Sequence, residues 1–184
     1  MQTPQFTACL RYVSEGMIAS EPRLTALDQV IGDGDHGIGI KRGFTALHTL
    51  LSSAEFAPAD IGECLLQSGT RLMTSMGGAS GAIFGTLFRA GGKALAGREQ
   101  FDAATLAEWL EIGMSAIHQR GGAEPGDKTM VDALAAAGRV LARAQQATVN
   151  APLLDNSAMD GYALAVADVP RLASILTDKS CLRP

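Results

Sequence analysis

Apolar side chains recur at every third or fourth position along most of the chain, the spacing of one face of an α-helix. The stripes are Phe6, Leu10, Val13 and Met17; Leu24, Leu27 and Ile31; Ile40, Phe44, Leu47 and Leu51; Ile61, Leu65, Leu72 and Met76; Ile83, Leu87 and Leu95; Leu106 and Ile117; and Val131, Leu134 and Leu141. Clusters of Gly and Pro separate them, at Glu21-Pro22, Gly32 to Gly39, Pro58, Gly77 to Gly81, Gly97 and Gly121 to Gly126. The pattern predicts an all-α fold of about seven amphipathic helices joined by short loops.

Composition and charge narrow the class of protein. A chain of 184 residues that is 47% hydrophobic has enough apolar material for one core. The formal net charge of −4 leaves no basic surface for nucleic acid. The chain has neither a basic start followed by an apolar run nor a membrane-spanning stretch, so we expect a cytoplasmic protein with its three cysteines reduced.

Three carboxylates gather in the first glycine-rich loop. Asp28 ends a helical pattern, and Asp33 and Asp35 follow two residues apart, with Gly32 and Gly34 allowing the chain to fold back toward Asp28. Like charges crowded in this way repel unless a cation lies between them, and hard cations such as Mg²⁺ take oxygen ligands. The loop therefore predicts a Mg²⁺ site with coordination positions left for phosphate oxygens.

Two other interpretations compete for this loop. A calcium-binding EF-hand would need a glutamate at the twelfth position counted from Asp33, where the chain has Phe44, so that template fails. A solvated acidic turn with aspartates as helix caps stays open. The adjacent His36 is either a hydrogen-bond donor to phosphate or a local cap.

The second loop, Met76 to Gly81, leads into an apolar helical stripe. Glycines let a backbone approach an anion closely, and unpaired N–H groups at a helix start carry about half a positive charge. The loop is a candidate phosphate cradle, although Ser80 also fits an ordinary N-cap.

The third loop, Gly121 to Met130, is similar to a Walker A loop. The template is broken because Asp127 stands between Gly126 and Lys128, and a helical pattern precedes the loop, so a P-loop ATPase is excluded. A helix start capped by Asp127 or Thr129 remains, followed by a flexible Met130 that can pack against a flat ring.

Together the three loops resemble the L subunit of dihydroxyacetone kinases, over roughly residues 5 to 145. The resemblance rests on Asp28, Asp33, Asp35, His36 and Gly37; on Gly77 to Gly81; and on Glu124 to Met130. It implies an up-and-down barrel of antiparallel helices with a nucleotide, ADP or ATP, held by loops at one end together with two Mg²⁺ ions. It also implies the site residues: Asp28, Asp33 and Asp35 as metal ligands, His36, Gly37, Ile38, Gly39, Ala79 and Ser80 against the phosphates, and Gly121 and Met130 near the base.

The resemblance also implies partners. In that family the substrate, a short-chain ketose such as dihydroxyacetone, is bound covalently to a histidine of a separate K subunit. A free-standing L chain resembles the systems in which a phosphotransferase-system protein recharges the bound nucleotide, and the fused enzymes that use ATP are the alternative. We also expect a homodimer.

The resemblance ends at about Asn150, so we divide the chain into an L-type helical domain, residues 1–150, and an atypical tail, residues 151–184. The family's Gly-Arg-Ala-Ser-type lid and its Asp-Pro-Gly segment do not occur in the sequence. Instead, Asp155 to Ala163 resembles a short signature of the molybdopterin molybdenumtransferases, to which we assign no molybdenum chemistry. By analogy with arginine fingers, a missing lid lowers the transfer rate about 10³-fold or more. The alternative function is therefore a nucleotide-binding or regulatory module with impaired turnover.

Overall fold

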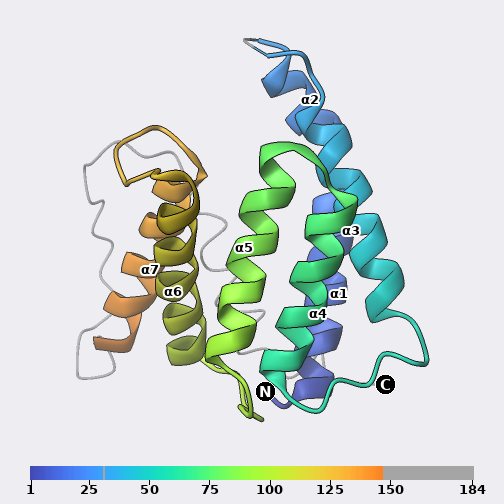
Figure 1. Ribbon diagram of the computed structural model, residues 1–184, viewed down its shortest axis with the longest axis vertical. Coiled ribbons are helices and arrows are strands. Elements are labelled where there is room, and N and C mark those ends of the chain that lie inside the picture. The colour runs from blue at the N-terminus through green and yellow to red at the C-terminus, as the bar shows by residue number, and fades with distance from the viewer. Residues whose placement is uncertain (31, 147–184) are drawn as a thin grey trace, which may run out of the picture. The chain divides into compact units, whose positions relative to one another are not determined.

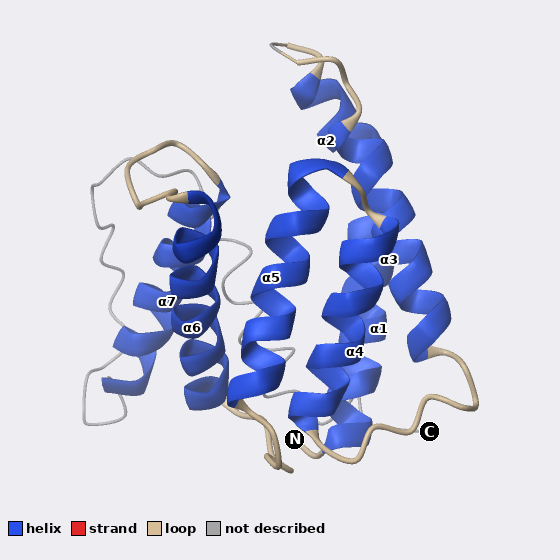
Figure 2. Cartoon of the chain, in the orientation of Figure 1, coloured by secondary structure: helices blue, strands red, loops and turns tan. Residues whose placement is uncertain are grey.

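The protein is built from α-helices in all the residues that the structure, a computed structural model, describes. These are residues 1–30 and 32–146, with side chains described up to Leu141. The helices are α1 (Thr3–Ala19), α2 (Glu21–Asp28), α3 (His36–Leu51), α4 (Ile61–Ser75), α5 (Gly78–Ala94), α6 (Ala103–Gly121) and α7 (Met130–Gln146). Figure 2 shows helices and loops without a strand in this part of the chain. The all-α class expected from the sequence is confirmed.

Met1–Gln145 form one compact unit. In Figure 1 the long helices run alternately up and down, so that the α2–α3 loop, the α4–α5 turn and the α6–α7 loop all lie at the end opposite the N-terminus. Among the helix pairs whose contacts are described, α4 with α5, α1 with α3, and α5 with α6 share extensive contacts. This arrangement brings the three loops singled out in the sequence to one end, while closure into a barrel and the boundary near residue 150 stay predictions.

Helices α4 and α5 are packed backbone against backbone. A Cβ added to Gly92 would lie 2.6 Å from the Leu66 nitrogen, and one added to Gly62 would lie 2.6 Å from the Ala96 nitrogen. Such close contact leaves little freedom to slide one helix along the other. The short turn between the two helices, Met76-Gly77, is therefore held at a fixed position.

Buried apolar side chains fill the space between the helices. Phe6 stacks on Phe101 with ring centroids 4.4 Å apart, and Phe88 meets Trp109 edge to face at 4.9 Å. The indole N–H of Trp109 donates to the carbonyl oxygen of Leu87 at 3.0 Å, which satisfies its only polar group. The core stripes predicted for α1 and α3 to α6 lie mainly inside.

Two expected core positions are wrong. Leu27 is 60% exposed and Val13 is 42% exposed. Leu27 belongs to the two-turn helix α2, which has no buried residue and ends at Asp28, before Ile31, whose placement lies outside the described residues. Helical spacing is thus present in α2, but no element among the described residues covers the Leu27 side chain.

Two helices also begin earlier than the glycine clusters in the sequence suggested. Gly37 and Gly39 lie in the first turn of α3, and α5 begins at Gly78 rather than after Gly81. Among the described residues no helix is both long and apolar enough to span a membrane.

Candidate metal and phosphate site

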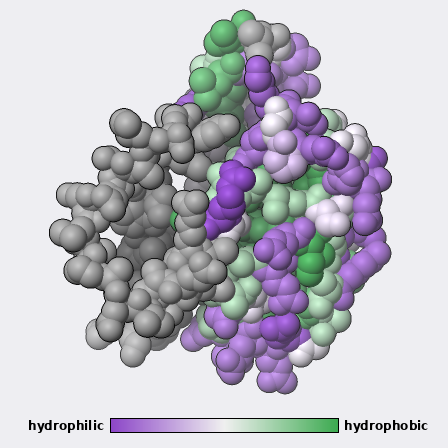
Figure 3. All heavy atoms as spheres, turned by 90° about the vertical axis from the view of Figure 1, so that its left-hand side faces the viewer, coloured by the Kyte–Doolittle hydropathy of each residue, from purple (hydrophilic) through white to green (hydrophobic). Residues whose placement is uncertain are grey.

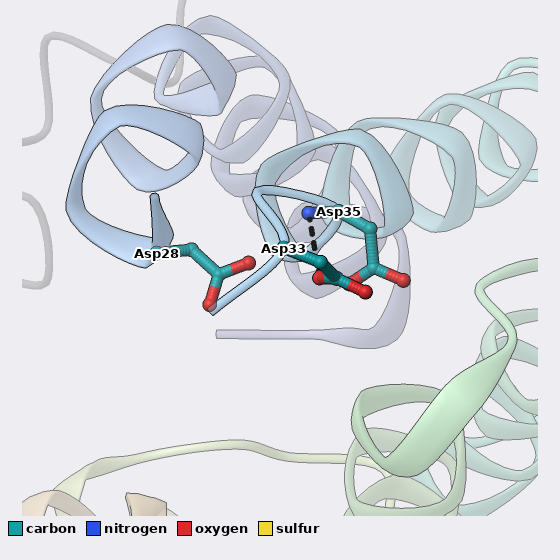
Figure 4. Close-up of side chains that lie close together, drawn as sticks. All are labelled: Asp28, Asp33 and Asp35. Atoms are coloured by element: carbon teal, nitrogen blue, oxygen red, sulfur yellow. Dashed lines mark hydrogen bonds between the residues drawn. The ribbon is translucent and has the colours of Figure 1, made fainter. Parts of the chain in front are cut away.

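The three loop aspartates converge. One carboxylate oxygen from each of Asp28, Asp33 and Asp35 lies within 4.8 Å of the other two. Asp28 is the last residue of α2, Asp33 lies in the loop, and Asp35 stands at the N-cap position of α3. Figure 4 shows the three side chains around a shared space.

Local backbone geometry explains this convergence. The N–H of Gly32 donates to the Asp28 carbonyl oxygen at 2.6 Å and turns the chain at the end of α2. Gly34 has a φ of 79°, in the left-handed region that glycine adopts without strain. A Cβ on Gly32 would collide with the Asp28 carboxylate. The two glycines are what lets the loop return to Asp28.

Hydrogen bonds within the protein occupy only some of the oxygen atoms of these three carboxylates. Asp28 Oδ2 accepts from the His36 N–H at 3.2 Å, and Asp33 Oδ1 accepts from the Asp35 N–H at 3.3 Å, the bond drawn in Figure 4. Asp35 makes no side-chain capping bond to α3. No Lys, Arg or His within the described ranges forms an ion pair with any of the three. Three hard oxygen donors without a counter-charge fit a divalent cation such as Mg²⁺.

His36 links the acidic loop to the second loop. Its Nδ1 lies 3.1 Å from the hydroxyl oxygen of Ser80, forty-four positions along the chain. The interpretation of Ser80 as an N-cap is wrong, because α5 has Gly77 at the N-cap and Ser80 lies within its first turn. The first N–H groups of a helix lack intrahelical acceptors, so this turn presents donors beside the carboxylates.

The remaining residues expected around the phosphates have different surroundings. Gly37 is buried, and a Cβ there would collide with Thr25 and with the backbone of Glu21, so this glycine serves the packing of α3 on α2. Ile38 is 55% exposed. Gly39 faces the Met76 carbonyl oxygen, and Ala79 is exposed in the first turn of α5.

The third loop lies at the same end of the bundle (Figure 1), but its described hydrogen bonds stay within the loop and its flanking helices. Gly121 ends α6 and Met130, which is half-buried, begins α7. The Thr129 hydroxyl accepts from the Val131 N–H at 3.2 Å, as expected of a cap. The structure thus joins the first two loops directly and leaves the third beside them.

Asp132 orders the third loop and was missed in the sequence. Its carboxylate accepts from the N–H groups of Gly126 at 2.6 Å and Thr129 at 2.9 Å, and these bonds lower the pKa of the carboxyl. The signal was present, because Thr129 and Asp132 have the spacing of a capping box, in which the acidic side chain reaches back to the cap N–H.

The chain is similar in sequence to a known domain family and to several known proteins. The DAK2 domain matches residues 30–174 of the chain. The ADP-binding subunit DhaL of the PEP-dependent dihydroxyacetone kinase of Escherichia coli (strain K12) is 42% identical over 109 residues, which are 59% of this chain and 51% of that subunit. The D-erythrulose kinase of Mycolicibacterium smegmatis is 35% identical over 122 residues, 66% of this chain and 21% of that enzyme. The chain spans about half the length of the subunits named DhaL that it matches.

Solved structures agree with the sequence comparison. The native dihydroxyacetone kinase of C. freundii superposes with a TM-score of 0.66 at 30% identity, covering 77% of this chain and 26% of that one. The same enzyme in complex with AMP-PNP and Mg²⁺ matches equally well. The likeness therefore extends to both the fold and the sequence.

Proposed function

The chain belongs to the DAK2 domain family, and from this premise we propose that it holds a Mg–nucleotide for a dihydroxyacetone-type kinase. The proposal rests on one observation: a candidate cation site and a helix N-terminus suited to anions lie next to each other at one end of the bundle. The carboxylates of Asp28, Asp33 and Asp35 offer a cation site, and His36 connects it to the first turn of α5 through Ser80. A cation site beside unpaired helix N–H groups is suited to the phosphates of a nucleotide.

Each group has a distinct task in this proposal. Asp28, Asp33 and Asp35 would hold one or two Mg²⁺ ions, whose charge offsets the phosphate charge when they are bound. The N–H groups of Ala79 and Ser80 orient the phosphates. His36 holds the Ser80 hydroxyl in place, since its own backbone N–H is fixed by Asp28. Gly121 and Met130 would lie near the base of the nucleotide.

The acceptor of the phosphate lies on another chain in this proposal. The acidic loop protrudes with α2 at the end of the molecule (Figure 1), and three exposed apolar side chains flank it: Leu27 at 60%, Val30 at 76% and Ile38 at 55%. Figure 3 shows hydrophobic surface at this end. Exposed apolar groups beside a polar site are typical of a docking surface. We assign it to a K subunit that carries a short-chain ketose, with a phosphotransferase-system protein or ATP as the phosphate source.

Titration calorimetry with Mg²⁺ and ADP tests this function. The wild-type chain is expected to bind ADP in the presence of Mg²⁺, and Asp33→Ala is expected to weaken binding at least about tenfold, because it removes one of three anionic ligands. Glu111→Gln, which removes an exposed carboxylate from α6, is the matched control and should bind as the wild type does. Equal ADP binding by Asp33→Ala and the wild type would refute the site.

A second function is favoured by one sequence feature. The family's Gly-Arg-Ala-Ser-type lid is absent from the 184 residues, and the expected tail lies outside the described residues. This second function is that of a nucleotide-binding or regulatory module with impaired turnover. A coupled kinase assay with an added K subunit separates the two functions, because phosphorylation of dihydroxyacetone above the level of the K subunit alone rules out the purely regulatory one.

A further inference from the structure

Arg42 reaches from α3 to the turn between α4 and α5. Its Nε donates a hydrogen bond to the carbonyl oxygen of Ser75 at 2.8 Å, and its Nη2 donates to the carbonyl oxygen of Met76. Both acceptors belong to the C-terminal end of α4, where carbonyl groups lack intrahelical donors. The guanidinium fork supplies two donors in one plane, which a lysine does not.

The positive charge of Arg42 lies near the C-terminus of α4 and the N-terminus of α5, two helix ends whose partial charges have opposite signs. The last carbonyls of α4 carry partial negative charge, and the first N–H groups of α5, which begins after the two residues Met76 and Gly77, carry partial positive charge. An anion attracted by α5 would be repelled by the α4 carbonyls. A guanidinium bound to those carbonyls offsets their charge, and no carboxylate in the described part of the chain forms an ion pair with it.

Helix α3 is pressed closely against the same turn. A Cβ on Gly43 would lie 2.8 Å from Cβ of the buried Met76, and one on Gly77 would lie 2.8 Å from Nη2 of Arg42. Helix α3 begins with His36 and therefore contacts this region at two points. His36 bonds Ser80 in the first turn of α5, and Arg42 bonds the end of α4. The distance between the acidic loop and the first turn of α5 is thereby fixed by a single rigid element.

We propose that Arg42 is a positioning residue for the nucleotide phosphates: it fixes the α4–α5 turn and neutralises the α4 carbonyls beside the anion. It acts through the turn and does not ligate the metal. This inference rests on the proposed function for the identity of the ligand. The effect of Arg42 on the order of residues 76–81 can be measured in the absence of any ligand.

The test compares three variants of the full chain. Arg42→Gln removes the charge and the fork, and Arg42→Lys keeps the charge but places all its N–H donors on one nitrogen. Arg89→Gln is the matched control, because Arg89 also joins α4 to α5, through a 2.9 Å bond to the Thr70 hydroxyl, away from the turn. Hydrogen exchange of the ligand-free chain and calorimetry with Mg²⁺ alone and with Mg²⁺ plus ADP are the measurements.

We expect Arg42→Gln to speed amide exchange in residues 76–81 and to raise the dissociation constant for ADP at least about tenfold, with the Mg²⁺ affinity changed less than about twofold. Arg42→Lys should recover part of the ADP affinity, and Arg89→Gln should leave all three quantities as in the wild type. Unchanged exchange at the turn, or unchanged ADP affinity in Arg42→Gln, overturns the inference. If the wild type itself binds no ADP, the proposed function fails, and the assignment of Arg42 to phosphate positioning fails with it.

Discussion

The Nδ1 of His36 lies 3.1 Å from the Ser80 hydroxyl oxygen, so the first turns of α3 and α5 meet beside the three aspartates. The backbone N–H of the same histidine donates to Asp28. One residue therefore connects a candidate metal ligand with a candidate phosphate-binding turn. A substitution at Asp28 should therefore affect phosphate binding, and a substitution at Ser80 should affect metal binding.

Loss of the Ser80 hydroxyl should weaken nucleotide binding. In Ser80→Ala, His36 loses its partner and the turn loses a donor near the phosphates, so we expect the dissociation constant for ADP in Mg²⁺ to rise about fivefold, the effect of one hydrogen bond. Thr49→Ala removes a comparable hydroxyl, bonded to the Thr45 carbonyl far along α3, and is the control. Calorimetry that gives the same affinity for Ser80→Ala and the control would remove Ser80 from the site.

The contact of α4 with α5 should tolerate no added methyl group. Gly92→Ala would place a Cβ 2.6 Å from the Leu66 nitrogen, and because this neighbour is backbone, we expect a loss of about 1–3 kcal/mol in the free energy of unfolding. Gly16→Ala in α1 meets nothing within 4 Å and should stabilise the protein by about 0.5–1 kcal/mol. Urea unfolding measures both, and a neutral Gly92→Ala would show that the helices are less closely packed.

The start of α6 should depend on one cap. Asp102 Oδ1 accepts from both the backbone N–H and the hydroxyl of Thr105, each at 2.8 Å. Asp102→Ala should therefore cost about 1–2 kcal/mol of unfolding free energy, the range of a strong N-cap. Asp102→Asn keeps the acceptor and should cost less, as urea unfolding near neutral pH would reveal. Equal losses for Ala and Asn would mean that the cap bond contributes little.

The charge of Asp102 should make this contribution depend on pH. The hydrogen bonds from Thr105 lower the pKa of the carboxyl from its ordinary value of 3.8. A group with a lowered folded-state pKa stabilises the fold above the unfolded-state value, and this stabilisation is lost as pH falls through the folded value. The stability difference between wild type and Asp102→Asn should be constant above about pH 5 and shrink below about pH 4. A difference that grew on acidification would have the wrong sign.

Periodicity predicted the helical class and most of the core, because a long helix that buries one face must repeat apolar residues on that face. It failed at Leu27, since α2 has only two turns and packs on α3 near Glu21 and Thr25, which leaves Leu27 60% exposed. The glycine clusters located the acidic loop and the α4–α5 turn but not the helix starts, because glycine also serves close packing, as at Gly37. The bond between His36 and Ser80 depends on tertiary packing and has no local signal, whereas Asp132 had one in its spacing from Thr129.

The most direct test of a joint metal and phosphate site is the dependence of ADP binding on Mg²⁺, measured by calorimetry with Mg²⁺ and with EDTA. We expect Mg²⁺ to tighten ADP binding by the wild type at least about tenfold, and Asp33→Asn, which keeps the shape of the side chain but not its charge, to abolish this gain. If Mg²⁺ strengthened ADP binding to the wild type and to Asp33→Asn by the same factor, the three aspartates would not hold the metal, and a joint metal and phosphate site would be refuted.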